Sequence, residues 1–265
     1  MLSIGEALAG VMGAVLPLGS EEVALTAALG RVLGEDVLGR MDSPPFTNSA
    51  MDGYAVRAGD LTEALKEAPV VLPVVGESSA GGRERPTCPS GVAVRIFTGA
   101  PLPAGADAVV LQEDVTRDGD SARFTEAAKV GQNIRQQGED ARVGDVLLRR
   151  GARVTPGEVG LLASQGIARV SVTRRPRVAV LSSGDELRRL EDPDRPGSII
   201  NSNAYMLEAM LRDAGAIPHV LPIAPDDLSA LTAALTDGLA ENDLVITSGG
   251  VSVGAHALKR PAFAA

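Results

Sequence analysis

Carboxylates follow two apolar runs in the C-terminal third of the chain. The run at residues 177–181 leads into a glycine turn that carries Asp185 and Glu186, and Asp226 and Asp227 come after a later run. Oxygen ligands of this kind suit a hard cation such as Mg²⁺, and they can also orient a hydroxyl-rich ligand. The same acids are favoured at the start of a helix, where they offset the positive end of the helix dipole. Both interpretations stay open for each pair.

A third apolar run leads into residues 247–254, TSGGVSVG. Gly249 and Gly250 let backbone N–H groups approach an anion closely, and the hydroxyls of Ser248 and Ser252 add donors. A tight strand-to-helix turn without a ligand explains the same residues. Because three successive runs all end in acidic or Ser/Gly residues, a polar ligand in one crevice explains the pattern better than helix capping alone.

These loops require a sheet that brings the ends of separate strands together. Apolar strands are expected at residues 177–181, 220–223 and 244–247, and helices are expected to begin near residues 203 and 227. Strands that alternate with helices predict an α/β domain with a parallel, doubly wound sheet. Ligands of such sheets bind beyond the carboxyl ends of the strands. Open sheets of this kind usually contain more than three strands, so we expect an incomplete domain.

The N-terminal part predicts two helices followed by a β-rich unit. Ser3 and Glu6 have the spacing of a capping box at the start of an amphipathic helix. A second, short helix is expected at residues 21–29, closed by Gly30. From residue 43 to about residue 135, short β-branched runs alternate with turns rich in Gly, Pro, Ser and Asp. This alternation predicts a β-rich unit.

Several polar side chains of the β-rich part could reach a ligand. Asp52 lies among small and polar residues, and a simple turn at Asp52 and Gly53 is the alternative interpretation. Thr98 lies in another turn, where its hydroxyl could contact a ligand. Arg135 precedes Asp140 in an acidic stretch. The fork of an isolated arginine can bind an anionic ligand, although a surface ion pair is the commoner role.

The composition narrows the classes of function. The chain has 265 residues with 25 Lys and Arg against 34 Asp and Glu, a net charge of −9. This balance argues against nucleic acid and anionic membranes as partners. One cysteine, Cys88, and two histidines leave almost no scope for thiolate or imidazole metal clusters, so any metal is expected to be a hard cation. No apolar run reaches the ~18 residues of a membrane span, and no signal pattern begins the chain, so we expect a soluble cytoplasmic protein.

Five segments of the chain form an ordered set of motifs. They are residues 43–57 (SPPFTNSAMDGYAVR), 96–100 (IFTGA), 133–140 (NIRQQGED), 183–187 (SGDEL) and 247–254 (TSGGVSVG). Together they resemble the MoeA family, which includes the E domain of gephyrin. The resemblance implies a molybdopterin molybdenumtransferase of molybdenum cofactor biosynthesis. Such an enzyme uses Mg²⁺, inserts molybdate into the dithiolene of adenylylated molybdopterin, and releases AMP.

The resemblance also implies a multidomain α/β architecture. Residues 1–45 and 139–174 would form an N-terminal linker and dimerisation domain of helices and strands, and residues 46–138 an inserted β-rich domain. Residues 175–265 would form an incomplete, MogA-like parallel α/β domain that binds molybdopterin. The family's C-terminal β-barrel, its Lys-Pro-Gly-Lys-Pro segment and an acid shortly after Gly254 have no counterpart. We therefore expect a truncated or frameshifted form of a longer chain.

Members of the family are homodimers, and their ligand lies between the α/β domain of one subunit and the β-rich domain of the other. By resemblance, the β-rich side contributes Asp52, Thr98, Arg135 and Asp140. The α/β side contributes Asp185, Glu186, Asp226 or Asp227, Ser248, Gly249, Gly250 and Ser252. The expected catalytic residues are Asp52, Glu186 and Asp227, and the expected Mg²⁺ ligands are Asp52, Glu186, Asp226 and Asp227.

Two other functions stay open beside the transferase. A truncated chain could be a non-catalytic remnant that binds the pterin or serves as a dimer scaffold. A MogA-type molybdopterin adenylyltransferase shares the α/β domain, but the long β-rich insertion around Asp52 speaks against it. A separate MogA-type adenylyltransferase is also a candidate partner, because it would supply the adenylylated substrate.

Overall fold

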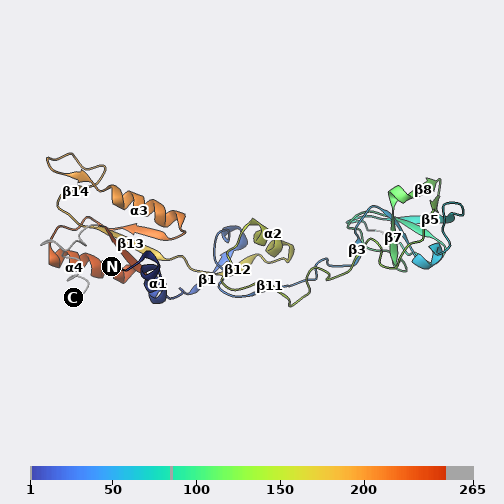
Figure 1. Ribbon diagram of the computed structural model, residues 1–265, viewed down its shortest axis with the longest axis horizontal. Helices are drawn as coiled ribbons and strands as arrows, with labels where there is room; N and C mark the ends of the chain where they lie inside the picture. Colours follow the sequence, from blue (N-terminus) through green and yellow to red (C-terminus); the bar gives the residue numbers. More distant parts are fainter. Residues whose placement is uncertain (1, 84–85, 249–265) are drawn as a thin grey trace. The chain divides into compact units, whose positions relative to one another are not determined.

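The computed structural model describes residues 2–83 and 86–248, and the chain forms two compact units (Figure 1). Unit 1 comprises Met1–Glu35, Arg150–Ala163 and Ala168–Ala265, and unit 2 comprises Asp36–Arg149 and Ser164–Ile167. Both helices and strands occur, so the fold is mixed α/β. Within the described ranges, no helix is long and apolar enough to cross a bilayer.

Unit 2 is built on a six-stranded sheet in the order β7-β4-β6-β5-β9-β8. The strands are β4 (Gly53–Val56), β5 (Val70–Ser78), β6 (Ala93–Ile96), β7 (Ala108–Leu111), β8 (Val115–Asp118) and β9 (Ser121–Phe124). Neighbouring strands are antiparallel except β5 and β6, which run parallel. The β-rich unit expected from the short β-branched runs is thus confirmed.

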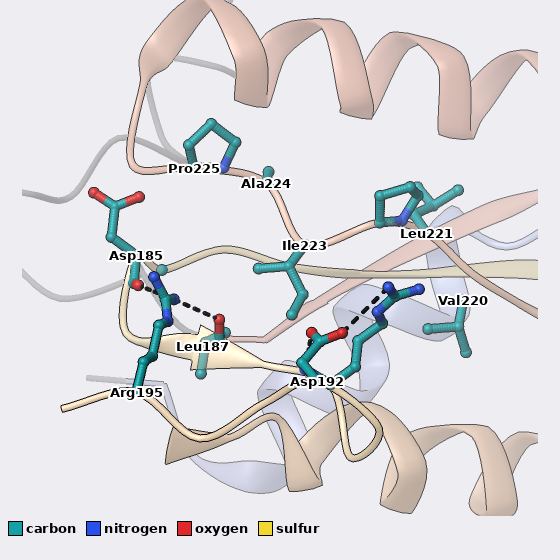
Figure 2. A pocket seen from close by; sticks show the side chains of 12 residues that line it. Asp185, Leu187, Asp192, Arg195, Val220, Leu221, Ile223, Ala224 and Pro225 are labelled. Atoms are coloured by element: carbon teal, nitrogen blue, oxygen red, sulfur yellow. Dashed lines mark hydrogen bonds and ion pairs between the residues drawn. The ribbon is translucent and has the colours of Figure 1, made fainter. Parts of the chain in front are cut away.

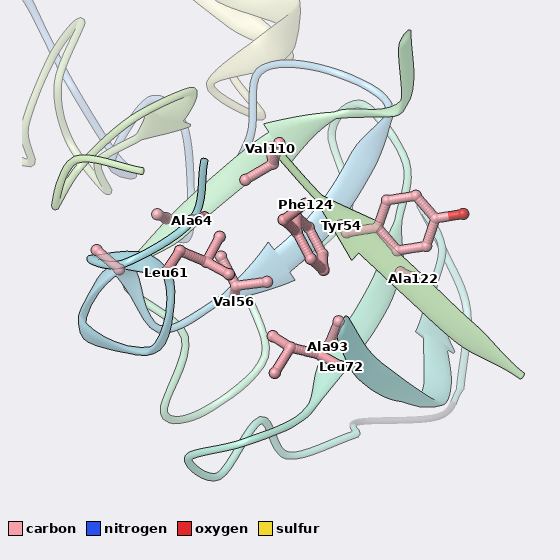
Figure 3. Packing of buried hydrophobic residues seen from close by; sticks show 11 residues of the cluster. Tyr54, Val56, Leu61, Ala64, Leu72, Ala93, Val110, Ala122 and Phe124 are labelled. Carbon is pink, nitrogen blue, oxygen red and sulfur yellow. The ribbon is translucent and has the colours of Figure 1, made fainter. Parts of the chain in front are cut away.

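Strand β4 of unit 2, which lies between β7 and β6, is buried on both faces of the sheet. Successive side chains of a strand point to opposite faces. Tyr54 accordingly joins the cluster around Phe124 (Figure 3). Ala55 joins a second cluster that includes Cys88. The rings of Tyr54 and Phe124 meet edge to face at 6.2 Å. Burial raises the pKa of the Cys88 thiol to about 11, so the thiol stays protonated and unreactive near neutral pH.

Short elements complete unit 2. They are β2 (Val37–Leu38), β3 (Asn48–Ser49), η2 (Ala58–Leu61), η3 (Gln112–Asp114), β10 (Ile134–Arg135) and β11 (Val146–Leu148). β3 pairs with β10, and β2 pairs with β11. The buried Gln165 side chain accepts hydrogen bonds from the backbone N–H groups of Arg40 and Met41. These contacts tie the four-residue excursion 164–167 to the rest of the unit.

One part of unit 1 combines elements from the start of the chain with elements from its middle. They are α1 (Ile4–Ala14), β1 (Ser20–Ala24), η1 (Leu25–Ala27), α2 (Pro156–Ser164) and β12 (Arg169–Thr173). The capping box of α1 is confirmed, because the Ser3 N–H donates to Glu6 Oε2 and the Glu6 N–H donates to Ser3 Oγ.

The helix expected at residues 21–29 is wrong. Ser20–Ala24 is strand β1, which pairs antiparallel with β12 from Ser20↔Thr173 to Ala24↔Arg169. Only a single 3-10 turn, Leu25–Ala27, follows it. The ladder with β12 supplies backbone hydrogen-bond partners that outweigh the local helix propensity of the segment.

The C-terminal part of unit 1 is an α/β sheet. Its elements are β13 (Arg177–Ser182), β14 (Leu187–Arg188), β15 (Ile199–Ile200), α3 (Ser202–Asp213), β16 (Ile217–Val220), α4 (Leu228–Glu241) and β17 (Leu244–Ser248). The sheet order is β16-β13-β17, and both pairs are parallel, as expected. Helices α3 and α4 lie on opposite sides of this sheet (Figure 1).

Strand β16, the second of the three along the chain, begins three residues earlier than expected. Its pairing with β13 runs from Arg177↔Ile217 to Val180↔Val220, whereas residues 220–223 were expected. The remaining expected residues continue as an extended segment, in which Pro222 has no N–H to donate. Leu221 N–H and Ala224 N–H still donate to carbonyls of β13. The strand order changes direction at β13, so the carboxyl end of this strand is the topological switch point where ligands bind.

Candidate functional site

In unit 2, Asp52 and Thr98 lie directly against each other. The backbone N–H and the Oγ1 hydroxyl of Thr98 both donate to Asp52 Oδ1, each at 2.7 Å. These hydrogen bonds, the backbone one foremost, lower the pKa of Asp52, so the carboxylate is ionised near neutral pH. Thr98 is exposed and Asp52 half-buried. Two residues predicted from separate turns are therefore brought together at the surface.

The register of the sheet explains how the pair forms. Asp52 immediately precedes β4, and Thr98 follows the end of β6, where Gly53 pairs with Ile96. A Cβ atom on Gly53 would lie 2.0 Å from the carbonyl oxygen of Val110 on β7. Only glycine fits this position, because the obstructing atom belongs to the backbone of a neighbouring strand. The Asp-Gly sequence thus sets the Asp52 carboxylate at the edge of a closely packed strand.

Arg135 and Asp140, the other two predicted residues of unit 2, form an ion pair. Arg135 Nη2 lies 2.5 Å from Asp140 Oδ2, and 40% of the arginine side chain is exposed. The hydrogen bond with Asp140 raises the pKa of Arg135 further above its ordinary value. The structure contains the surface ion pair, and a ligand role for either residue stays a prediction.

In unit 1, the loops after the parallel strands are linked by hydrogen bonds. Ser182, at the end of β13, is opposite Ser248 at the end of β17. The Ser182 hydroxyl donates to Asn201 Oδ1 at 3.2 Å, and the Asn203 amide donates to Ser248 Oγ at 3.0 Å. Both asparagines lie at the start of α3, so the ends of β13 and β17 meet the N-terminus of that helix. The predicted residues Gly249, Gly250 and Ser252 lie outside the described residues.

A pocket of ≈ 680 Å³ opens beside the end of β13 (Figure 2). It is lined by Gly184, Asp185, Leu187, Arg189, Asp192, Arg195 and residues 220–225. Asp185 Oδ1 accepts a hydrogen bond from the Asp226 N–H at 3.3 Å, which joins the loop after β13 to the loop after β16. The pocket joins two of the three loops that were predicted to share one crevice, and the third, after Ser248, lies outside the described residues.

Two arginines and two aspartates supply the charged groups that line the pocket. Arg195 Nη2 donates to the carbonyl oxygens of Asp185 and Leu187, at 2.6 and 3.1 Å (Figure 2). Carbonyl acceptors do not neutralise its charge. Arg189 Nη2 lies 3.3 Å from Asp192 Oδ1, and the hydrogen bonds from Arg189, its backbone N–H foremost, lower the pKa of Asp192. The walls therefore combine fixed cations, carboxylates and apolar strand-end residues, as in sites for polar ligands with an anionic group.

Arg189, Asp192 and Arg195 were not predicted from the sequence. They lie in the segment between β14 and β15, which has no helical or strand periodicity. The alternation of basic and acidic residues with prolines in LRRLEDPDRPG was the only signal, and it is typical of any solvated loop.

The remaining predicted acids of unit 1 have structural contacts. Asp227 caps α4, because its Oδ1 accepts a hydrogen bond from the Ala230 N–H at 2.8 Å. The Glu186 carboxylate lies over Gly184, where a Cβ atom would meet its Oε2 at 2.5 Å. Gly184 also has a φ of +147°, which favours glycine. The helix-start interpretation that was left open is therefore observed for Asp227.

The expected Mg²⁺ ligands do not form a cluster in the described ranges. Among residues 2–83 and 86–248, no three His, Cys, Asp or Glu side chains lie close enough together to hold a metal ion. The predicted ligands Asp52, Glu186, Asp226 and Asp227 were expected to come from two subunits, so a magnesium site formed by them stays a prediction. No chemical step is assigned to a metal below.

Two family models match the chain. The MoeA N-terminal region (domain I and II) matches residues 2–166, and the probable molybdopterin binding domain matches residues 179–265. Molybdopterin molybdenumtransferase 2 of Mycobacterium tuberculosis is 44% identical over 241 residues, which are 91% of this chain and 60% of the relative. Molybdopterin molybdenumtransferase of Haemophilus influenzae is 43% identical over 239 residues, 90% of this chain and 58% of the relative. The chain thus spans about 60% of the length of these relatives.

Solved structures with the same fold carry a related description. A crystal structure of the molybdopterin biosynthesis moeA protein from Pyrococcus horikoshii OT3 has a TM-score of 0.82 and 36% identity, and covers 87% of this chain and 61% of that one. A second structure of the Pyrococcus protein has a TM-score of 0.83 and 33% identity, and covers 98% of this chain and 66% of that one.

Proposed function

Because the chain belongs to the MoeA family, we propose that it acts as a molybdopterin molybdenumtransferase of molybdenum cofactor biosynthesis. The reaction is the insertion of molybdate into the dithiolene of adenylylated molybdopterin, with release of AMP. The observation that carries the proposal is the Asp52–Thr98 pair, in which two hydrogen bonds hold an ionised carboxylate at the surface of unit 2. The pocket at the switch point of the α/β sheet also supports the proposal.

The proposed chemistry needs positioning and charge more than covalent catalysis. Cleavage of a phosphoanhydride depends mainly on aligned groups and on stabilisation of phosphoryl charge. Arg195, whose acceptors are carbonyl oxygens, supplies positive charge at the pocket, and Asp52 supplies a carboxylate held by Thr98. The soft sulfur ligands of molybdenum belong to the substrate, so the single, buried Cys88 is no obstacle. Mg²⁺ stays a prediction, because the described residues of one chain contain no group of three possible ligands and the expected site lies between two subunits.

We further propose that the chain acts as a homodimer, in which the β-rich unit of one subunit faces the α/β part of its partner. The exposed apolar side chains of α1 support a partner for this helix. Ile4 is 90% exposed, Met12 66%, and Leu8 and Val11 60% each. An amphipathic helix whose apolar residues stay exposed gains stability only when another surface covers them. Light scattering of the purified chain should give twice the 27.2 kDa chain mass, and a monomeric mass would contradict the dimer.

The activity test is molybdate-dependent release of AMP from adenylylated molybdopterin by the purified chain. We expect release by the unchanged chain and a loss of about 10²–10⁴-fold in Asp52→Asn, which keeps the shape of the side chain but removes its charge. The matched control is Asp118→Asn, an exposed acid at the end of β8, which should retain activity.

Other outcomes of this test identify the alternatives. Ligand binding without AMP release would indicate a non-catalytic pterin-binding or scaffold protein. Adenylylation of molybdopterin that is insensitive to Asp52→Asn would indicate a MogA-type adenylyltransferase instead. In the proposed pathway, a separate MogA-type adenylyltransferase supplies the adenylylated substrate in the cytoplasm.

A further inference from the structure

Arg95, in the middle of β6, lies between two aromatic rings close to the Asp52–Thr98 pair. Its Cζ atom is 5.1 Å from the ring centroid of Tyr54 and 4.8 Å from that of Phe97. Both rings attract the guanidinium through their negative faces, and a flat cation fits between them better than a tetrahedral one. Tyr54 is itself held in the core of unit 2 against Phe124 (Figure 3).

The guanidinium also fixes the backbone that carries Asp52. Nη1 donates to the carbonyl oxygen of Gly53 at 3.0 Å, and Nη2 donates to Gln112 Oε1 at 2.5 Å. The backbone N–H of Gln112 in turn donates to the carbonyl oxygen of Asp52 at 3.1 Å. One side chain therefore holds the residue after Asp52 directly and the carbonyl of Asp52 through one intermediate.

The same side chain contacts the turn that carries Thr98. Phe97, the second ring over the guanidinium, immediately precedes Thr98, whose N–H and hydroxyl bond to Asp52. The pairing of Tyr54 with Arg95 across β4 and β6 places the guanidinium between the two segments. Both halves of the pair are thus attached to one fixed cation.

We propose that Arg95 is a positioning residue for the proposed transfer reaction, which keeps the Asp52 carboxylate and the Thr98 turn assembled before the ligand arrives. The inference rests on the proposed function of Asp52. Pre-assembly matters because small misplacements of a reacting group cost large factors in rate. The positive charge of Arg95 also lowers the pKa of Asp52, by less than the Thr98 hydrogen bonds do.

The direct test is hydrogen exchange of the Thr98 amide in the full chain, followed by NMR. Arg95→Met keeps an unbranched apolar stem without the fork or the charge, and Arg95→Lys keeps a stem and the charge without the fork. We expect the Thr98 amide to exchange at least about tenfold faster in both variants, because neither can make the two directed bonds. Amides of the core strands should exchange as before. The matched control is Arg123→Met, an exposed arginine on β9 of the same sheet, which should leave Thr98 unchanged.

The activity measurement separates positioning from a general loss of fold. In both Arg95 variants, kcat for AMP release should fall by about 10-fold or more while KM changes less, since Arg95 acts through Asp52. Recovery of kcat in Arg95→Lys would show that charge alone matters and would overturn the proposal. An unchanged Thr98 exchange rate in folded Arg95→Met would overturn it as well, whatever the activity.

Two further outcomes are distinguishable. If Arg95→Met does not fold, Gln112→Ala is the second variant, because it removes one acceptor of Arg95 at an exposed position. It should speed exchange of the Thr98 amide by a smaller factor. An unchanged Thr98 exchange rate in Gln112→Ala counts against the proposal. If Thr98 exchange responds to Arg95 but Asp52→Asn leaves AMP release intact, the proposed function fails, and the structural link between Arg95 and Thr98 still holds.

Discussion

The two regions that carry the candidate site use their acidic residues in different ways. In unit 2, Asp52 receives two hydrogen bonds from Thr98, and its own backbone is held by other residues. In the α/β part of unit 1, Asp227 caps α4 and Asp185 receives a backbone N–H from the next loop. In unit 2, other residues hold the acid in place. In the α/β part of unit 1, the acids hold the backbone of neighbouring segments in place.

This difference decides which experiment is informative at each position. An acid that other residues hold in place can be replaced while the chain still folds. Its replacement should therefore lower activity more than it lowers the free energy of unfolding. An acid that caps a helix or closes a loop contributes to stability, so a loss of activity after its removal says little about chemistry. Asp52 and Asp227, both predicted as catalytic, are therefore expected to respond in opposite order.

The largest expected effect is on the scaffold of unit 2. Phe124→Ala removes a fully buried ring that packs edge to face on Tyr54, and should lower the free energy of unfolding by about 3–5 kcal/mol. Hydrogen exchange with mass spectrometry in rising urea should show earlier opening of the unit 2 strands. If β13 and α4 of unit 1 open earlier to the same extent, the two units do not unfold separately and the comparison loses its basis.

A smaller loss is expected at the strand that positions Asp52. Gly53→Ala places a methyl group 2.0 Å from the Val110 carbonyl oxygen, and the resulting strain should cost about 1–3 kcal/mol in urea unfolding. Gly59→Ala is the matched control, because nothing lies within 4 Å of a Cβ there. Equal stability of the two variants would show that β4 can shift, and the Asp52 carboxylate would then not be fixed by its strand.

The sequence correctly predicted those helices and strands that are determined by residues close together in the chain. The capping box of Ser3 and Glu6, the strand that begins at Arg177, and the parallel sheet all follow from spacing and periodicity. The strand β1 did not, because its partner β12 is remote in the chain and the segment itself favours a helix. Tertiary pairing decided its conformation.

The sequence predicted several residues of the candidate site, but it did not predict which of them contact one another. Asp52 and Thr98 were each singled out, yet the bond between them joins positions 46 residues apart. Arg95, Arg189 and Arg195 were missed, since the role of an arginine depends on the acceptors and rings that the fold brings to it. No spacing in the sequence encodes those partners.

The next effect tests the acids of unit 1. Asp227→Ala should destabilise the chain by about 1 kcal/mol, because the Ala230 N–H loses its capping acceptor. Asp227→Ser keeps an acceptor and should recover most of that loss in thermal unfolding. Asp226→Ala, one residue earlier, is the control. If Asp227→Ser is stable but inactive in AMP release, the carboxylate itself takes part in the reaction and the contrast with Asp52 disappears.

The smallest effect is a shift in titration, and it compares one acid from each region. The pKa of Asp243 is lowered to about 2 by the Arg174 guanidinium first and the Arg177 N–H second, and that of Asp52 is lowered by Thr98. Each of the two carboxylates makes its full contribution to the stability of the fold above its unfolded pKa of about 3.9. That contribution is lost as the pH falls through the lower pKa of the folded state. Carboxyl NMR should show that Thr98→Val raises the pKa of Asp52 only in part, because the backbone N–H remains, and leaves Asp243 unchanged. An unchanged pKa of Asp52 would mean that the Thr98 hydroxyl does not bond to the carboxylate in solution. Asp52 would then be held in place by the backbone N–H of Thr98 and by Arg95 alone.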